Sequence, residues 1–191
     1  IGGVIPKREH LLVQTAQGMR QRYNIDVRTR HEVLRIDRTA RKVEVLDHST
    51  GRRYTEDYDV LVLCTGAAPI LPSALEGPRS YVLRSMNDMD RITQAVAGLE
   101  AGSPVVIVGG GFIGLELSEN LHKRGLSVTI VEMAEQVMLN LDREMAALVH
   151  RHLRSKGVAL ILNDGVSRVE HGEHDAVVRL SSGHQLKAKA V

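Results

Sequence analysis

The clearest hydrophobic pattern surrounds a glycine-rich turn in the second half of the chain. Val105–Val108 is a continuous apolar run, which is typical of a strand buried on both faces of a parallel sheet. After the turn, Ile113, Leu117 and Leu121 recur at the spacing of one helical face, and Ser127–Val131 is a second apolar strand. These patterns predict a strand, a helix and a parallel strand in order.

Helices are also predicted on either side of this unit. Ser85 and Asp88 have the S-x-x-D spacing of a capping box, in front of a helix of about three turns. Downstream, Asp142 can cap a helix that ends at Gly157. The inward face of this helix is predicted to carry Met145, Val149 and Leu153. A strand-like tetrapeptide lies at Tyr81–Arg84, a third parallel strand is predicted at Val158–Leu162, and an antiparallel β-meander at Val166–Val169, Ala176–Leu180 and Gln185–Lys187.

The first third of the chain has shorter patterns. Four side chains between Leu12 and Tyr23 share one helical face, which predicts an amphipathic helix over about residues 7–22, with Pro6 placed to start it. Five strands are predicted after it, at residues 25–28, 32–37, 42–46, 53–55 and 59–66.

A domain boundary is predicted after the last of these strands. Residues 59–66 contain an apolar run that is typical of a buried strand and ends at Gly66. Ala67–Pro78 contains three prolines, so we interpret it as a linker. We therefore expect one domain in residues 1–75 and a second in residues 79–191.

Composition and charge exclude several classes of function. The formal net charge of +2 comes from dispersed Lys and Arg residues, which gives no support to nucleic-acid binding. No apolar run approaches the roughly 18 residues that cross a bilayer, and the nine histidines form no metal-binding cluster. The single cysteine excludes an internal disulfide and suits a reducing compartment, so we expect a cytoplasmic protein. Because the chain opens with Ile1 and stops where another strand begins, we expect a piece of a longer protein.

The glycine-rich turn carries the main functional signal. Gly109, Gly111 and Gly114 fit G-x-G-x-x-G directly after a strand, and Glu132 ends the next strand 23 residues after the first glycine. In such a unit the first glycine permits the turn, the second lets the backbone approach a pyrophosphate, and the third lets the helix pack closely. The acid accepts hydrogen bonds from the ribose of NAD, and the helix N-terminus attracts the phosphates. A glycine-rich turn without a nucleotide is the alternative, but the order of all five features favours the dinucleotide.

Four motifs together resemble one enzyme family. They are Tyr58–Pro69, Leu83–Asp88, the dinucleotide unit and Val137–Met145, and they cover nearly all 191 residues. The chain resembles the middle of the FAD-dependent pyridine nucleotide-disulfide oxidoreductases, in the branch that holds coenzyme A disulfide reductases, NADH oxidases and persulfide reductases. The resemblance implies an α/β fold of the glutathione-reductase-like type, with a Rossmann-like NAD(P)-binding domain inserted into an FAD-binding domain.

The resemblance also assigns cofactor contacts residue by residue. Residues 1–75 would be part of the FAD-binding domain and residues 79–191 most of the NAD(P)H-binding domain. Val33, Thr65, Gly66 and Arg84 would contact FAD, although Val33 can also be a strand residue and Arg84 a surface arginine. NAD would lie against the turn residues Gly109, Gly110, Gly111, Phe112, Ile113 and Gly114, with Glu132 on the ribose and Glu116 near the nicotinamide. An ordinary glutamate on the helix surface is the alternative for Glu116.

The implied activity is electron transfer from NADH through FAD to a cysteine centre outside this chain. That centre would reduce a small-molecule disulfide or persulfide, such as coenzyme A disulfide, and the full-length protein would be a homodimer. An NADH oxidase and a ferredoxin- or rubredoxin-type reductase are alternatives, and residues 1–191 alone are expected to be a non-catalytic nucleotide-binding module. Tyr23 replaces a lysine that meets coenzyme A in this branch, which leaves other thiols open. Cys64 ends an apolar strand, so we expect it to be buried and inert.

Overall fold

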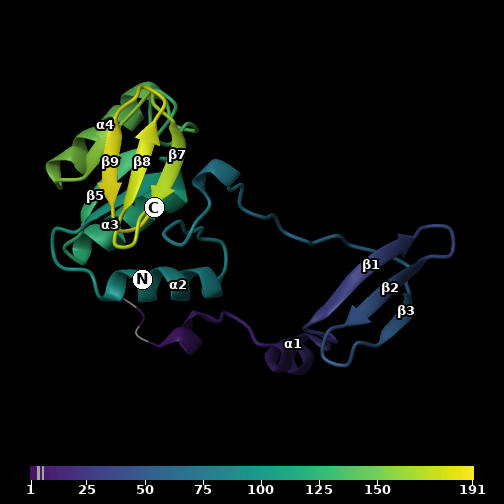
Figure 1. The fold of residues 1–191 in the computed structure, drawn as a ribbon. Coiled ribbons are helices and arrows are strands. Elements are labelled where there is room, and N and C mark those ends of the chain that lie inside the picture. The colour runs from purple at the N-terminus through teal and green to yellow at the C-terminus, as the bar shows by residue number, and fades with distance from the viewer. Residues whose placement is uncertain (4, 6) are drawn as a thin grey trace. The chain divides into compact units, whose positions relative to one another are not determined.

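The computed structural model describes residues 1–3, 5 and 7–191, which form two compact units (Figure 1). The smaller unit is Ile5–Ala67, and the larger is Ala68–Val191 together with the first residues of the chain. The division falls at the start of the proline-containing segment that predicts a boundary. Pro6, which was expected to start a helix, lies outside the described residues.

The smaller unit is an antiparallel sheet preceded by short helices. Its elements are the 3-10 helix η1 (Arg8–Leu11), the helix α1 (Ala16–Tyr23) and the strands β1 (His31–Asp37), β2 (Lys42–Asp47) and β3 (Arg53–Asp57). The strands pair in the order β1-β2-β3 through short turns. Hydrogen bonds from the hydroxyls of Ser49 and Thr50 and from the backbone N–H of Ser49 close the second turn on Asp47, and they hold the pKa of Asp47 far below its usual range.

The helix predicted over residues 7–22 is interrupted. The segment forms η1, which ends at Leu11, and then α1, which begins only at Ala16. The reason is a helix cap, because the Thr15 hydroxyl accepts a hydrogen bond from the N–H of Gly18 at 3.0 Å. The predicted single helix is therefore wrong, although its second half forms as expected.

Two predicted strands of this unit do not form. In residues 25–28, the side chains of Asp26 and Arg28 form an ion pair at 2.9 Å, and Arg28 also donates to the Tyr54 hydroxyl at 3.1 Å. In residues 59–66, the apolar side chains stay exposed, with Val60 at 81%. A strand needs a neighbour for its backbone groups, and in the described part of this unit the ladders join only β1 to β2 and β2 to β3.

The larger unit contains a parallel sheet, helices and a β-meander. Its strands are β4 (Pro104–Val108), β5 (Ser127–Val131), β6 (Ala159–Ile161), β7 (Val166–His171), β8 (Ala176–Leu180) and β9 (Gln185–Ala188); its helices are η2 (Ser73–Leu75), α2 (Met86–Ala97), α3 (Phe112–Lys123) and α4 (Arg143–Ser155). The parallel strands have the order β4-β5-β6, and the meander has the order β7-β8-β9. The predicted strand, helix, strand unit, third parallel strand and meander are confirmed.

The parallel sheet is covered on both faces. Val105, Ile107 and Ile130 face α2 and α3, where they pack with Leu121 and other apolar side chains. The alternate positions, such as Val106, face the meander (Figure 1). Both faces are therefore apolar, which explains why the strands appear in the sequence as continuous hydrophobic runs.

The chain end adds to the open edge of this sheet. Ala190 forms a parallel bridge with Val105, and the N–H of Val106 donates to the Ala190 carbonyl at 3.0 Å. The next residue of the chain end, Val191, accepts from the N–H of Tyr81 at 2.8 Å. The strand expected at the end of the chain therefore begins beside β4, whereas Tyr81–Arg84 forms no regular strand.

The capping box is confirmed, but two details of α4 are wrong. Ser85 and Asp88 exchange the expected hydrogen bonds at the start of α2. Asp142 is the N-cap residue of α4, yet among the described residues its side chain accepts no cap hydrogen bond. The second detail is the inward face. In α4, Met145 is 53% exposed and its neighbour Ala146 is fully buried. Ala146 and Leu153 are seven residues apart and share the inward face, so the larger apolar side chain of Met145 points outward.

Replacing Ser85 with alanine is expected to lower the free energy of unfolding of the larger unit by about 1 kcal/mol. The substitution removes the hydroxyl that accepts from the N–H of Asp88 and donates to its carboxylate at 2.7 Å. Urea denaturation followed by circular dichroism measures the change. Ser155→Ala is the control, because it removes a surface hydroxyl from the end of α4, and equal losses in both variants would contradict the capping role.

Candidate dinucleotide-binding site

The glycine-rich turn lies at the carboxyl end of β4 and leads into α3. Gly109 has a φ of 104°, a backbone conformation that residues with a side chain rarely adopt. Its N–H donates to the Val131 carbonyl of β5 at 2.8 Å. Gly111 is the N-cap residue of α3, and no atom lies within 4 Å of the place where its Cβ would be. The turn therefore leaves open space directly in front of the unpaired N–H groups of the helix.

Gly114 and Gly110 are positions of close packing. A Cβ on Gly114 would lie 2.2 Å from the Gly109 carbonyl oxygen, so the helix can approach the strand end only without a side chain. A Cβ on Gly110 would lie 2.6 Å from a methyl carbon of Val137, in the loop that follows β5. The geometry agrees with the expected roles of Gly109 and Gly114, whereas the packing of Gly110 against Val137 was not predicted.

Glu132 directs its carboxylate at the turn. Its Oε2 accepts the N–H of Gly110 at 2.7 Å, and its Oε1 accepts the N–H of Ala134 at 2.8 Å. The backbone of Glu132 is fixed as well, because its N–H donates to the Ile161 carbonyl at 2.8 Å. Each carboxylate oxygen keeps a second lone pair, so the group can still accept hydrogen bonds from a ligand.

The loop after β5 backs the turn. Val137 is fully buried, and the N–H of Met138 donates to the Gly110 carbonyl at 2.9 Å. Next to Val137, the buried Gln136 side chain donates to the Leu141 carbonyl at 2.8 Å. The loop also contains Met133, Met138, Leu139 and Leu141, so its composition does not single out Val137 as the residue that meets the turn.

The remaining residues of the first turn of α3 are exposed. Phe112 is 63% exposed, and Ile113 lines an apolar cavity of about 290 Å³ together with Leu117 and Leu121, as expected for one helical face. Glu116 lies on the exposed side of α3, where its backbone carbonyl accepts from Asn120. Phe112 and Ile113 thus directly follow the glycine turn at the start of α3, and Glu116 lies one helical turn further along.

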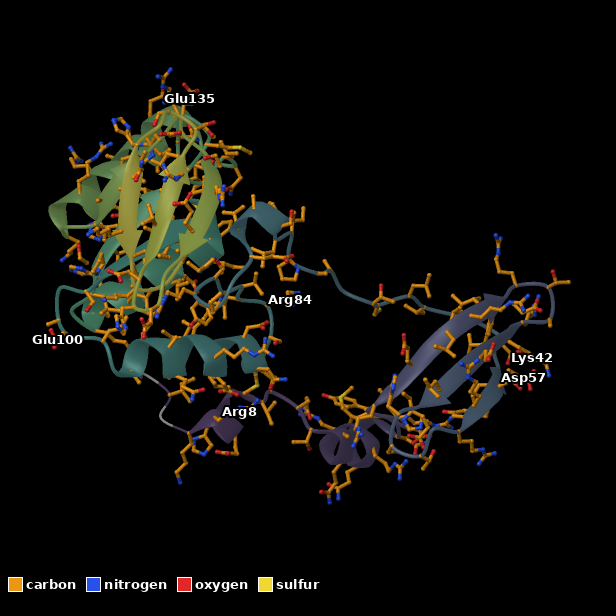
Figure 2. The ribbon with its side chains drawn as sticks, in the orientation of Figure 1. Arg8, Lys42, Asp57, Arg84, Glu100 and Glu135 are labelled. Carbon is orange, nitrogen blue, oxygen red and sulfur yellow. The ribbon has the colours of Figure 1, made fainter. Side chains whose placement is uncertain are left out.

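The loop after β5 and the start of α4 carry an exposed pair of opposite charges. Residues 133–135 contain no arginine, yet Arg143 at the start of α4 lies 3.7 Å from the Glu135 carboxylate. Glu135 is exposed at the tip of the loop (Figure 2). Asp164 accepts from the Ser182 N–H at 3.1 Å, and the Ser182 hydroxyl holds the pKa of Asp164 below its usual range. Asp164 therefore ties the meander to the strand ends beside the turn.

The residues expected to contact FAD are distributed over both units. Val33 of β1 and Thr65 line one open cavity of about 440 Å³ in the smaller unit, and Gly66 follows with a φ of 70°. Arg84 precedes α2 in the larger unit (Figure 2), where its N–H donates to Asp88 at 3.2 Å. Their contacts with FAD stay predictions.

Cys64 is exposed rather than buried. The difference has a physical cause, because the apolar segment that carries Cys64 does not pair as a strand and so is not covered. Within the part of the chain that the structure describes, no three His, Cys, Asp or Glu side chains are grouped so as to hold a metal ion. None of the helices described here combines the length and the apolar composition that a membrane crossing requires.

Comparisons with known proteins agree on one family. Residues 3–191 match the family described as pyridine nucleotide-disulphide oxidoreductase. The coenzyme A disulfide reductase of Staphylococcus haemolyticus (strain JCSC1435) is 32% identical over 187 residues, which are 97% of this chain and 41% of that protein. The chain therefore spans about two fifths of the length of this curated relative.

Two solved structures share the fold over nearly the whole chain. The reduced CoADR-RHD of Bacillus anthracis has 42% sequence identity and a TM-score of 0.90, and the match covers 99% of this chain and 34% of that one. The NAD-dependent persulfide reductase from A. fulgidus has 31% identity and a TM-score of 0.89, with 100% of this chain and 36% of that one covered.

Replacing Gly114 with alanine is expected to lower the free energy of unfolding of the larger unit by about 1–3 kcal/mol. Alanine favours a helix by up to about 1 kcal/mol over glycine, but a Cβ 2.2 Å from the Gly109 oxygen must push α3 away from β4. Gly98→Ala is the control, because no atom lies within 4 Å of its Cβ position. A Gly114 variant as stable as the Gly98 variant in urea denaturation would show that the close approach is not required.

Proposed function

The chain belongs to the pyridine nucleotide-disulphide oxidoreductase family, and from this premise we propose that it is part of a flavoenzyme in which NADH reduces a small-molecule disulfide or persulfide. In this proposal residues 79–191 form most of the NADH-binding domain, and residues 1–75 contribute to the FAD-binding domain. The full-length protein acts as a cytoplasmic homodimer. The observation that carries the proposal is the glycine turn with the Glu132 carboxylate directed at it.

The residues at the turn suit NAD in charge and in shape. The open space at Gly111 admits a pyrophosphate close to the backbone, where the helix N-terminus offers N–H groups and a partial positive charge. Glu132 lies at the end of the neighbouring strand, and its free lone pairs suit the ribose hydroxyls. The chain thus orients a dinucleotide by a fixed anion site at one end and a fixed acceptor at the other.

The chemistry of electron transfer would come from the cofactors when they are bound, as hydride transfer from the nicotinamide to the flavin. The share of this chain is placement. Its smaller unit offers Val33, Thr65 and Gly66 to FAD, and the cavity lined by the first two supports that assignment. Flavin absorbance in the purified chain tests whether this part alone retains FAD.

The substrate class follows from the relatives and is a proposal for the whole protein. One relative is a coenzyme A disulfide reductase and another is a persulfide reductase. Tyr23, which replaces the lysine expected for coenzyme A, ends α1 with the Arg22 guanidinium 5.3 Å from its ring centre. We therefore propose a disulfide or persulfide of a small thiol, with coenzyme A as one candidate. An assay of the full-length enzyme with coenzyme A disulfide, a persulfide or oxygen distinguishes these acceptors.

Replacing Gly111 with alanine is expected to weaken NADH binding by about tenfold or more while the stability of the fold is unchanged. The new methyl group meets no protein atom within 4 Å, but it fills the space assigned to the pyrophosphate. The dissociation constant for NADH, measured by fluorescence, checks this. Gly98→Ala controls for a general effect of alanine, and unchanged binding by the Gly111 variant would contradict a pyrophosphate at the turn.

NADH is expected to bind more tightly than NADPH, by about 2–4 kcal/mol or roughly 30- to 1,000-fold. The Glu132 carboxylate accepts from the ribose hydroxyls and repels a 2′-phosphate. Glu132→Ala should bring the two dissociation constants closer together, mainly by weakening the binding of NADH. The matched control is Glu135→Ala, which removes an exposed carboxylate paired with Arg143. Equal affinity of the wild type for both cofactors, or an unchanged ratio in the Glu132 variant, would show that Glu132 does not discriminate.

A further inference from the structure

We infer that His150 of α4 is a positioning residue for the dinucleotide turn, and that it holds the loop behind the turn only while its imidazole is neutral. The expected effect of His150 on cofactor binding rests on the proposed function. The role of His150 in the loop rests on one contact, in which the Val137 N–H donates to the His150 Nε2 at 3.1 Å.

The contact belongs to a continuous path from α4 to Glu132. Val137 is fully buried and fills the space beside Gly110, whose Cβ would lie 2.6 Å from it. The next residue, Met138, donates its N–H to the Gly110 carbonyl at 2.9 Å. Gly110 in turn donates to Glu132 at 2.7 Å. A shift of the Val137 backbone would therefore be transmitted to the turn that faces the cofactor.

The loop needs such a support because its backbone is strained. Met138 has a φ of 54°, in the left-handed region that costs energy for a residue with a side chain. Such a conformation persists only where surrounding contacts enforce it. The Gln136 side chain ties the middle of the loop to Leu141 near its end, and the His150 side chain accepts from the backbone of the next residue, Val137.

The chemistry of the contact requires a neutral ring. A backbone N–H can only donate, so the His150 Nε2 must carry no proton and the proton of the neutral ring lies on Nδ1. Protonation would turn both ring nitrogens into donors and set two N–H groups against each other. Burial, and then the charge of Arg154 one turn along α4, lowers the pKa of His150 from its ordinary value. The contact is thus present at neutral pH, and it is lost as the pH falls through the lowered pKa.

Other charged groups lie on the elements that carry this contact, which are α4, β5 and the loop between them. They are Arg151 and Arg154 on α4, Asp142 before it, the paired Glu135 and Arg143, and Glu132 at the end of β5. Among them, Arg154 acts on the pKa of His150. His150→Gln is a suitable variant, because the glutamine oxygen can accept from the Val137 N–H and does not titrate. His152→Gln is the matched control, since it removes an exposed histidine from the same helix.

The experiment follows two signals from pH 7.5 downward through the lowered pKa of His150, to about pH 5. One is the dissociation constant for NAD⁺, and the other is the amide resonances of Val137 and Gly110 in the NMR spectrum of the chain. In the wild type and in His152→Gln, NAD⁺ binding should weaken about three- to tenfold as the pH falls, as expected for one lost hydrogen bond. Both amide resonances should move with the same midpoint. In His150→Gln, both signals should be nearly independent of pH.

Several results would overturn the inference. Amide resonances of Val137 and Gly110 that do not titrate in the wild type would exclude the contact, and this measurement needs no variant. A His150→Gln protein that titrates like the wild type would assign the pH dependence to another group. If the wild type binds no NAD⁺ at any pH, the proposed function is contradicted and the cofactor part of the inference with it. The amide titration would then still confirm or exclude the role of His150 in the loop.

Discussion

The structure of the site depends on one charged contact, in which the Glu132 carboxylate accepts the N–H of Gly110. The two groups come from the ends of neighbouring parallel strands, and the parallel direction brings both ends to the same edge of the sheet. A charge-assisted hydrogen bond of this kind is stronger than a neutral one. The close approach of Gly114 to the Gly109 carbonyl then sets the height of α3 above that edge. Together these contacts place a negative charge and a helix N-terminus at fixed positions in one site.

Much of the larger unit could be predicted from the sequence because its signals are local. Val105–Val108 and Ser127–Val131 are apolar at consecutive positions, since both faces of the sheet are covered. The start of α2 is fixed by two side chains three residues apart. The glycine spacing and Glu132 likewise follow from the short-range geometry of a turn between a strand and a helix.

The rest depends on contacts that no local pattern contains. Residues 59–66 have the composition of a buried strand, but a strand also needs a partner strand for its backbone groups, and in the described part of the chain no strand pairs with it. Met145 and Ala146 are both compatible with the inward face of α4, and packing selects the smaller one. The contact between His150 and Val137 joins residues 13 apart across a strained loop, and periodicity cannot indicate such a contact.

The central claim is that the turn at Gly109–Gly114 and Glu132 bind the dinucleotide. It is tested most directly by adding NAD⁺ to the ¹⁵N-labelled chain and following every amide resonance. The account predicts that the largest changes fall on Gly111, Phe112 and Ile113, which begin α3, with a smaller change at Ala134, whose N–H is bonded to the Glu132 carboxylate. Changes that are largest elsewhere, or no change at millimolar NAD⁺, would contradict it.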